Sequence, residues 1–304
     1  MQWTGVMPAI TTAFDEELNV DHAFVARHAQ WLVANGCSGI VCLGSLGESA
    51  TLAFDERIAI VRTIAAAVSP AAPVVAAVSA LSTAEAVRIA KASADAGAQG
   101  LMILPPYVYQ GDWRETRAHI EAVLRATTLP AMLYNNPVAY GTDFAPTQIA
   151  ELAERSPNLA AVKESSTDVR RVTAIRALIG DRLSIMVGVD DAIVEGIEAG
   201  AVGWVAGLVN ALPRESVDLF NLASQDDKKN AFKLYQWFLP LLRMDTVPKF
   251  VQLIKQVQEE ISVGSARVRP PRLQVLGEEL VETRKLLAHA LAHRPAIARP
   301  SSPF

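Results

Sequence analysis

The stretch that decides the fold is Leu159-Ala160-Ala161-Val162-Lys163, in which four apolar residues end on a lysine. The run is short and shows no alternation of polar and apolar residues, as expected of a strand buried on both faces. Strands of this kind belong to parallel sheets that helices cover. A lysine at the end of so apolar a strand either extends its charge to solvent or lies in a site at the strand's end.

The same apolar pattern occurs eight times along the chain. The runs are residues 5–12, 39–43, 74–78, 100–104, 131–134, 159–163, 184–187 and 202–206. Each is nearly continuous in its apolar character, so each is predicted to be a fully buried strand.

The segments between the runs have the spacing of helices. In residues 55–68 the apolar side chains recur on one helical face, and Ser82 with Glu85 predicts a capping box for the next helix. The glycines placed to end helices are Gly36, Gly97, Gly180 and Gly200. Alternation of strands and helices implies parallel strands joined by right-handed crossovers. Eight units favour an α/β fold of the closed (β/α)8 TIM-barrel type, and an open doubly wound sheet is the alternative.

The pattern changes after about residue 223. Three helical stretches, 228–244, 247–261 and 272–292, follow without a strand, and Gly264 and Pro270-Pro271 mark a loop over residues 263–271. We therefore expect the barrel in residues 1–224 and a C-terminal three-helix appendage in residues 225–293. The Pro- and Ser-rich residues 294–304 are expected to be a disordered tail.

Composition excludes several classes of protein. The 304 residues are 51% hydrophobic, and 28 basic against 32 acidic residues leave a net charge of −4, so no nucleic-acid partner is expected. The apolar stretch 200–212 is shorter than the roughly 20 residues that span a bilayer, and residues 1–4 do not begin a signal peptide. Cys37 and Cys42 lie about 16 Å apart along an extended chain, too far for a disulfide. A cytoplasmic protein without a membrane partner is expected.

The second apolar run continues into the glycine-containing loop Gly44-Ser45-Leu46-Gly47-Glu48-Ser49. Barrel enzymes build their sites at the carboxyl ends of the strands, where this loop lies. Its two glycines permit a tight turn, whose backbone N–H groups and Ser45 hydroxyl can hold an anion such as a carboxylate. An ordinary strand-to-helix turn is the alternative interpretation.

Two more strand ends carry candidate catalytic residues. Tyr134, followed by Asn135-Asn136-Pro137, could relay a proton, although a tyrosine of the core is the more common case. Lys163, if buried in the barrel mouth, has its pKa lowered by desolvation and supplies the free amine that attack on a carbonyl requires. Lys163, Tyr134 and Ser45 are predicted at one face, which strengthens all three as catalytic candidates.

The sequence gives little sign of a metal or an organic cofactor. Asp190-Asp191 follow the seventh strand and could ligate a metal, but such a pair more often caps a helix. The histidines lie in helical stretches without a ligand motif; they are His22, His28, His119, His289 and His293. Gly44 and Gly47 do not form a dinucleotide fingerprint. We expect no metal and no cofactor.

Three motifs in this order resemble the dihydrodipicolinate synthase / N-acetylneuraminate lyase superfamily. They are Gly44-Ser45-Leu46-Gly47-Glu48-Ser49-Ala50-Thr51-Leu52, Tyr134-Asn135-Asn136-Pro137 and Val162-Lys163-Glu164-Ser165, to which Gly188-Val189-Asp190-Asp191 adds. The resemblance covers nearly the whole chain.

The resemblance implies a Schiff-base enzyme acting on a small 2-oxo acid or cyclic imino acid. Lys163 would form the Schiff base, Tyr134 would shuttle protons, and Ser45 with the Leu46 amide would hold the substrate carboxylate and connect to Tyr134. The other substrate-binding residues would be Gly44, Gly47, Val189 and Val205. Members are commonly homotetramers, so a homo-oligomer is expected.

At three positions this sequence differs from dihydrodipicolinate synthases, which limits the reactions that the resemblance implies. Dihydrodipicolinate synthases carry an arginine two residues after the proline of the tyrosine motif, where this chain has Ala139, and a second hydroxyl residue where it has Leu46. They also lend a tyrosine across the subunit interface, where this chain has Val108 between Tyr107 and Tyr109. A role in lysine biosynthesis is therefore not favoured.

A closer resemblance is to one group of Δ1-pyrroline-4-hydroxy-2-carboxylate deaminases, which yield 2-oxoglutarate semialdehyde and ammonia. Its markers are Tyr140 and Asp143, Lys163-Glu164-Ser165-Ser166 with Arg170-Arg171, Val202-Gly203-Trp204-Val205, Trp237-Phe238-Leu239-Pro240-Leu241-Leu242 and Arg269-Pro270-Pro271-Arg272. The alternatives are an aldolase or dehydratase of a 2-oxo-3-deoxy sugar acid, a dihydrodipicolinate synthase, and a non-catalytic ligand-binding barrel. Fold alone does not choose among them.

Overall fold

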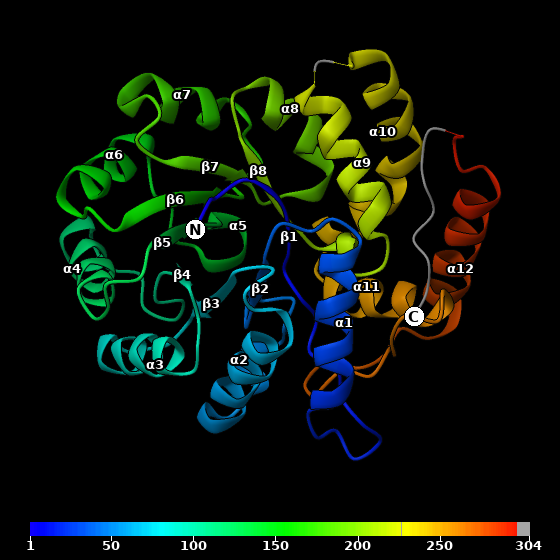
Figure 1. Ribbon diagram of the computed structural model, residues 1–304, viewed down its shortest axis with the longest axis horizontal. Helices are drawn as coiled ribbons and strands as arrows, with labels where there is room; N and C mark the ends of the chain where they lie inside the picture. The colour runs from blue at the N-terminus through cyan, green and yellow to red at the C-terminus, as the bar shows by residue number, and fades with distance from the viewer. Residues whose placement is uncertain (226, 297–304) are drawn as a thin grey trace.

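The computed structural model describes residues 1–225 and 227–296 and contains a ring of eight parallel strands (Figure 1). The strands are β1 (Gly5–Pro8), β2 (Ile40–Cys42), β3 (Val74–Val78), β4 (Gly100–Ile103), β5 (Ala131–Asn135), β6 (Leu159–Glu164), β7 (Ser184–Val187) and β8 (Gly203–Ala206). Their order is β1-β8-β7-β6-β5-β4-β3-β2, and a parallel bridge between Ala9 and Val41 joins the two ends. The predicted (β/α)8 barrel is confirmed, and the open sheet is excluded.

The first strand is shorter than the apolar run that predicted it. The strand ends at Pro8, whereas the run extends to residue 12. The Ile10 N–H still donates to the Val41 carbonyl of β2 at 2.9 Å, but beyond it the chain bonds to side chains. The Thr11 amide donates to Asn210 Oδ1 at 3.1 Å, and the Thr11 hydroxyl donates to Gln258 Oε1 at 3.0 Å. Both partners come from the last third of the chain, so apolar periodicity could not reveal this change.

Helices surround the strand ring, as Figure 1 shows. They are α1 (His22–Ala34), α2 (Phe54–Val68), α3 (Thr83–Asp95), α4 (Trp113–Leu124), α6 (Pro146–Arg155), α7 (Arg170–Ile179), α8 (Ile193–Glu198) and α9 (Pro213–Ser224), with the short α5 (Pro137–Tyr140) after β5. Gly36, Gly97, Gly180 and Gly200 end helices with positive φ, as predicted. Ser82 caps α3, but Glu85 bonds Arg88 instead of completing a capping box. Cys37 and Cys42 are buried free thiols.

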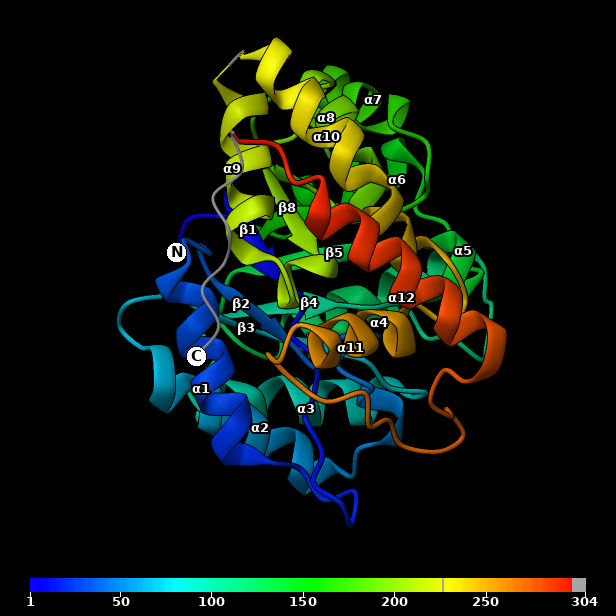
Figure 2. The same cartoon turned by 90° about the vertical axis from the view of Figure 1, so that its right-hand side faces the viewer.

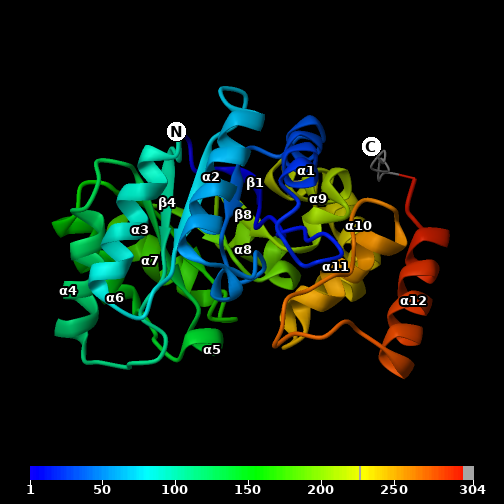
Figure 3. The ribbon, with the colours of Figure 1, turned by 90° about the horizontal axis from the view of Figure 1, so that it is seen from below.

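The C-terminal helices are gathered on one side of the barrel, next to α1 and α9 (Figure 3). They are α10 (Lys228–Leu242), α11 (Phe250–Glu260) and α12 (Gly277–Ala292). Helix α12 lies on the outside of this group (Figure 2). It is bound to α10, because Trp237 Nε1 donates to the Ala290 carbonyl at 2.7 Å. Two of them begin later than predicted. Val247 precedes a proline and is extended, so α11 starts at Phe250 instead of residue 247. Leu276 is extended and Gly277 has a φ of 61°, so α12 cannot begin at residue 272.

The end of the described chain is held by an ion pair. Arg294 lies 3.2 Å from the carboxylate of Glu215, a fully buried residue of α9. Arg294, the first residue of the predicted tail, is therefore held against the barrel, while residues 297–304 lie outside the described part and the disordered tail stays a prediction. The division at residues 224 and 293 stays a prediction. Among the described residues no helix is long and apolar enough to cross a membrane.

Candidate active site

A cavity of about 520 Å³ opens at the carboxyl ends of the strands. Of the predicted site residues, it is lined by Gly44, Ser45, Leu46, Tyr134, Lys163, Val189 and Val205. These seven residues come from the ends of five strands that are distant in sequence, so the barrel brings them together. Their catalytic and binding roles stay predictions.

Lys163 and Tyr134 lie side by side because of the register of two strands. Tyr134 of β5 pairs directly with Lys163 of β6, and residues paired in this way project to the same face of a sheet. Lys163 Nζ lies 4.3 Å from the centre of the Tyr134 ring. The amine and the phenol can therefore act on the same small molecule.

The Lys163 amine is buried, and its pKa is lowered. The side chain is 6% exposed, and burial lowers the pKa of Lys163 to about 8, a shift that the carboxyls of Asp245 and Asp190 oppose. Gly188 makes room for it, because a Cβ at this position would lie 2.5 Å from Lys163 Cε. Any larger residue there would displace the lysine.

We expect Schiff-base formation to accelerate with pH up to about 8. Below this value the ammonium form of Lys163 predominates, and it has no electron pair with which to attack a carbonyl. The rate of pyruvate imine formation, followed by borohydride trapping at a series of pH values, should rise through pH 7 and level off above pH 8. A rate that keeps rising to about pH 10.4, as for an unperturbed lysine, would contradict this.

Tyr134 belongs to a cluster of hydroxyl groups. Asn136 Nδ2 donates to the Tyr134 hydroxyl at 3.0 Å, and the Tyr140 ring meets the Tyr134 ring edge to face with centroids 5.7 Å apart. The Ser45 hydroxyl hydrogen-bonds to the Tyr140 hydroxyl. Burial raises the pKa of Tyr134, and the hydrogen bond from Asn136 partly opposes the shift. Tyr140, which served only as a marker of the closer resemblance, is thus a member of the site.

The tyrosines near β4 have different positions. Tyr107 lines the cavity of its own chain, with its ring centre 6.3 Å from that of Tyr140. Val108 is 75% exposed and Tyr109 is 59% exposed, and the Tyr109 hydroxyl donates to Glu115 outside the cavity. Within this chain Tyr107 therefore lies beside the hydroxyl cluster, whereas Tyr109 faces away from it.

Gly47 is the exception among the predicted site residues, because it does not line the cavity. Its carbonyl accepts a hydrogen bond from the Thr12 hydroxyl at 2.7 Å, and a Cβ at Gly47 would lie 3.1 Å from the Ile10 carbonyl. The residue packs the loop against the segment after β1. Gly47 thus lies behind the cavity lining, and its role in substrate binding stays a prediction.

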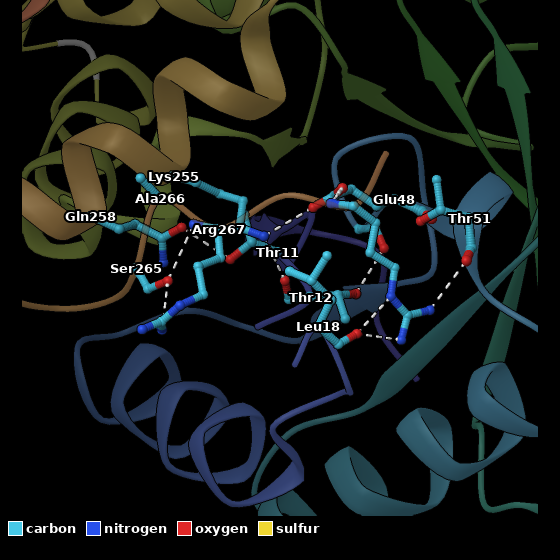
Figure 4. Close-up of polar contacts among 12 residues, drawn as sticks. Thr11, Thr12, Leu18, Glu48, Thr51, Lys255, Gln258, Ser265, Ala266 and Arg267 are labelled. Atoms are coloured by element: carbon cyan, nitrogen blue, oxygen red, sulfur yellow. Dashed lines mark hydrogen bonds and ion pairs between the residues drawn. The ribbon is translucent and has the colours of Figure 1, made fainter. Parts of the chain in front are cut away.

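The glycine loop is fixed from behind by a buried ion pair (Figure 4). Glu48 is 0% exposed and Lys255 of α11 is 2% exposed, and Lys255 Nζ donates to Glu48 Oε1 and to the Thr12 carbonyl, both at 2.9 Å. Glu48 Oε2 accepts from the Arg269 backbone N–H at 3.0 Å. The C-terminal region therefore holds the loop that carries Ser45.

We expect Glu48→Gln to destabilise the protein by about 3–5 kcal/mol, because it leaves the buried Lys255 ammonium without its counter-charge. Urea unfolding followed by circular dichroism measures the change. The matched control is Glu279→Gln, which breaks an exposed pair with Lys249 and should cost less than about 1 kcal/mol. Equal small losses in both variants would show that the buried pair does not support the loop.

Asp190 accepts hydrogen bonds from the segment around β8, a role that the sequence did not indicate. Its fully buried carboxylate accepts from Trp204 Nε1 at 3.0 Å and from the backbone N–H groups of Gly207 and Leu208 at 3.0 and 2.8 Å. Burial raises the pKa of Asp190 to about 6, although these donors oppose the shift. The carboxylate thus orders the turn after β8. Among residues 1–225 and 227–296 no group of three or more His, Cys, Asp or Glu side chains could hold a metal ion.

The sequence did not predict one wall of the cavity, which the C-terminal region supplies. Asp245, in the 3-10 helix η4 (Arg243–Thr246), lines the cavity, and so does Arg272 in the segment before α12. No carboxylate pairs with the Arg272 guanidinium in the described part of the chain. Although Ala139 replaces an arginine in the tyrosine motif, the cavity therefore contains a guanidinium from another element.

Comparison with known proteins identifies this arrangement. Residues 2–290 match the sequence profile of the dihydrodipicolinate synthetase family. The chain belongs to that family. The resemblance found in the three motifs is confirmed, and the protein is an enzyme of the lyase type that this family comprises.

Individual relatives of the family extend over the whole chain. The 4-hydroxy-tetrahydrodipicolinate synthase of Natronomonas pharaonis is 32% identical over 287 residues, which cover 94% of this chain and 97% of the relative. The solved structure of the 4-hydroxy-tetrahydrodipicolinate synthase of Methylacidiphilum fumariolicum SolV has 27% identity and a TM-score of 0.92, covering 98% of this chain and 100% of that one. YagE of E. coli K12, a family member solved in complex with pyruvate, has 25% identity and a TM-score of 0.89, with 96% and 99% covered.

Proposed function

We propose that this enzyme is a deaminase that converts Δ1-pyrroline-4-hydroxy-2-carboxylate into 2-oxoglutarate semialdehyde and ammonia. The observation that carries the proposal is the small, largely apolar cavity around Lys163. Leu46 and Ala139 line it at the two positions where dihydrodipicolinate synthases would have a hydroxyl and an arginine. A compact ring with one carboxylate suits such a cavity better than a dicarboxylate, because buried charges need partners.

The chemistry fits the groups around the cavity. The Lys163 amine attacks C2 of the ring imine, and opening of the ring leaves a Schiff base at C2. This iminium withdraws electrons, so that a C3 proton becomes acidic and Tyr134 can carry it. The C4 hydroxyl is then lost as water, and isomerisation of the C3=C4 double bond, with protons moving from C5 and its amine to C3 and C4, turns the C5 amine into an imine. Hydrolysis of this imine releases ammonia, and hydrolysis of the Schiff base at C2 frees Lys163 and the semialdehyde. The Gly44–Leu46 part of the loop would hold the carboxylate throughout.

One observation favours a second candidate, the condensation of pyruvate with aspartate semialdehyde. Arg272 places a guanidinium in the cavity, where it could bind a second carboxylate. The relatives from Natronomonas pharaonis and Methylacidiphilum fumariolicum bear the name of the synthase that this reaction defines.

Two assays on one preparation distinguish the candidates. We expect ammonia release from Δ1-pyrroline-4-hydroxy-2-carboxylate, measured with glutamate dehydrogenase, and little condensation of pyruvate with aspartate semialdehyde. Efficient condensation without ammonia release would reject the deaminase and support the synthase. Failure of both would favour an aldolase or dehydratase of a 2-oxo-3-deoxy sugar acid, which a panel of such acids tests next. The homotetramer and the cytoplasmic location stay predictions.

A further inference from the structure

Asp245 is an acidic residue of the cavity to which the proposed function has not yet given a role. It lies on η4, outside the barrel strands, yet it lines the same cavity as Lys163 and Val205. Its side chain is partly exposed in the isolated chain. A molecule bound to Lys163 can therefore reach the Asp245 carboxyl.

The position of Asp245 depends on Gly207, the residue after β8. A Cβ at Gly207 would lie 2.1 Å from Asp245 Oδ1 and 2.7 Å from its Cγ, so any other residue would push the carboxyl away. The Gly207 N–H is itself held by Asp190. The structure thus brings this carboxyl directly against the barrel mouth.

Asp245 differs from Asp190 in its partners. Asp190 accepts hydrogen bonds from Trp204, Gly207 and Leu208, whereas no described residue donates a hydrogen bond to the Asp245 carboxyl. Its polar atoms are therefore available to a ligand.

Burial and the neighbouring carboxyls together favour the neutral form of Asp245. The charged groups that face it are Asp190 and Asp191 from the segment after β7 and Lys163 from β6. Burial and the charge of Asp190 raise the pKa of Asp245 well above its usual range, and Lys163 opposes the shift. The balance of these effects therefore favours the protonated form of Asp245. Arg272, the other charged residue of this wall, cannot act as a proton donor, because a guanidinium does not give up its proton.

We propose that Asp245 is the catalytic acid that protonates the C4 hydroxyl of the substrate as it leaves, an inference that rests on the proposed deaminase function. After C3 has lost its proton, the Lys163 adduct is an enamine. Its nitrogen electron pair forms the N=C2 bond, the C2=C3 pair moves to C3–C4, and the C4–O bond breaks. The oxygen takes the Asp245 proton and leaves as water, and the carboxylate that remains regains a proton from solvent.

The test compares two reactions of Asp245→Asn, which keeps the size of the side chain and removes its acidic proton. Ammonia release should fall on the order of 10²-fold, the lower range for a lost general acid. Exchange of the pyruvate methyl protons with deuterium oxide needs Lys163 and Tyr134 but no leaving group, so it should stay within a few-fold. Asp181→Asn, a fully exposed site, is the matched control and should change neither rate.

The outcomes separate this inference from the proposed function. Equal loss of both reactions, or loss of neither, would overturn the role of Asp245. Wild-type enzyme that exchanges pyruvate protons but releases no ammonia would overturn the deaminase function. The protonated state is tested independently by infrared spectroscopy: a carboxylic acid C=O band at neutral pH should disappear in Asp245→Asn, and absence of that band from the wild type would overturn the inference.

Discussion

Lys163→Ala should abolish turnover and covalent adduct formation together. The variant removes the only amine that lies beside Tyr134 in the described part of the cavity, so no Schiff base can form and no electron sink develops at C2. The expected activity is that of the uncatalysed reaction, measured by ammonia release and by mass spectrometry after borohydride treatment.

Two variants control this result. Lys163→Arg keeps a cation near Asp190 and Asp245 but cannot form the imine, so it should be equally inactive. Lys91→Ala removes an exposed lysine of α3 and should retain the wild-type rate. Appreciable turnover in Lys163→Arg would show that the charge of the lysine, and not its nucleophilicity, is what the reaction needs.

Tyr134→Phe should slow turnover by roughly 10²–10⁴-fold, the range for loss of a positioned proton carrier. The phenylalanine ring can fill the same place against Lys163 and Tyr140, so the change removes the hydroxyl and leaves the packing. Borohydride should still trap an adduct at Lys163, although more slowly, because attack by the amine does not itself require the phenol.

Tyr235→Phe is the matched control for the tyrosine variant. The Tyr235 hydroxyl bonds to the Asp191 carbonyl and to Glu195, away from the cavity lining, so its loss should leave activity within a few-fold of the wild type. Wild-type turnover in Tyr134→Phe would reject the proton shuttle.

The barrel and the position of Lys163 could be predicted from the sequence because both depend on local patterns. A continuous apolar run identifies a buried strand, and the carboxyl ends of parallel strands meet at one face. Lys163 and Tyr134 end two successive runs, and their direct pairing follows from this geometry.

The wall formed by the C-terminal region could not be predicted in the same way. Asp245 lies in a short 3-10 helix and Arg272 in an irregular segment. Neither segment has a periodic pattern of apolar residues that would show which of its side chains face the barrel. Gly207 is the one available signal, because a glycine just after a buried strand often marks the close approach of another group.

The glycine loop was predicted in part. Its tight turn brings Ser45 and Leu46 to the cavity, but Gly47 faces the other way, toward the Ile10 carbonyl. The orientation of the turn depends on the Glu48–Lys255 pair, whose members are separated by more than two hundred residues and carry no shared motif. Long-range buried pairs of this kind are visible only in the folded chain.

The central claim is that Lys163 forms the Schiff base, and borohydride trapping tests it most directly. The enzyme is incubated with pyruvate or another 2-oxo acid, reduced with borohydride and mapped by peptide mass spectrometry. The predicted result is the mass of the reduced ligand on Lys163 alone. No adduct with any 2-oxo acid tested, or an adduct on a different lysine, would contradict it.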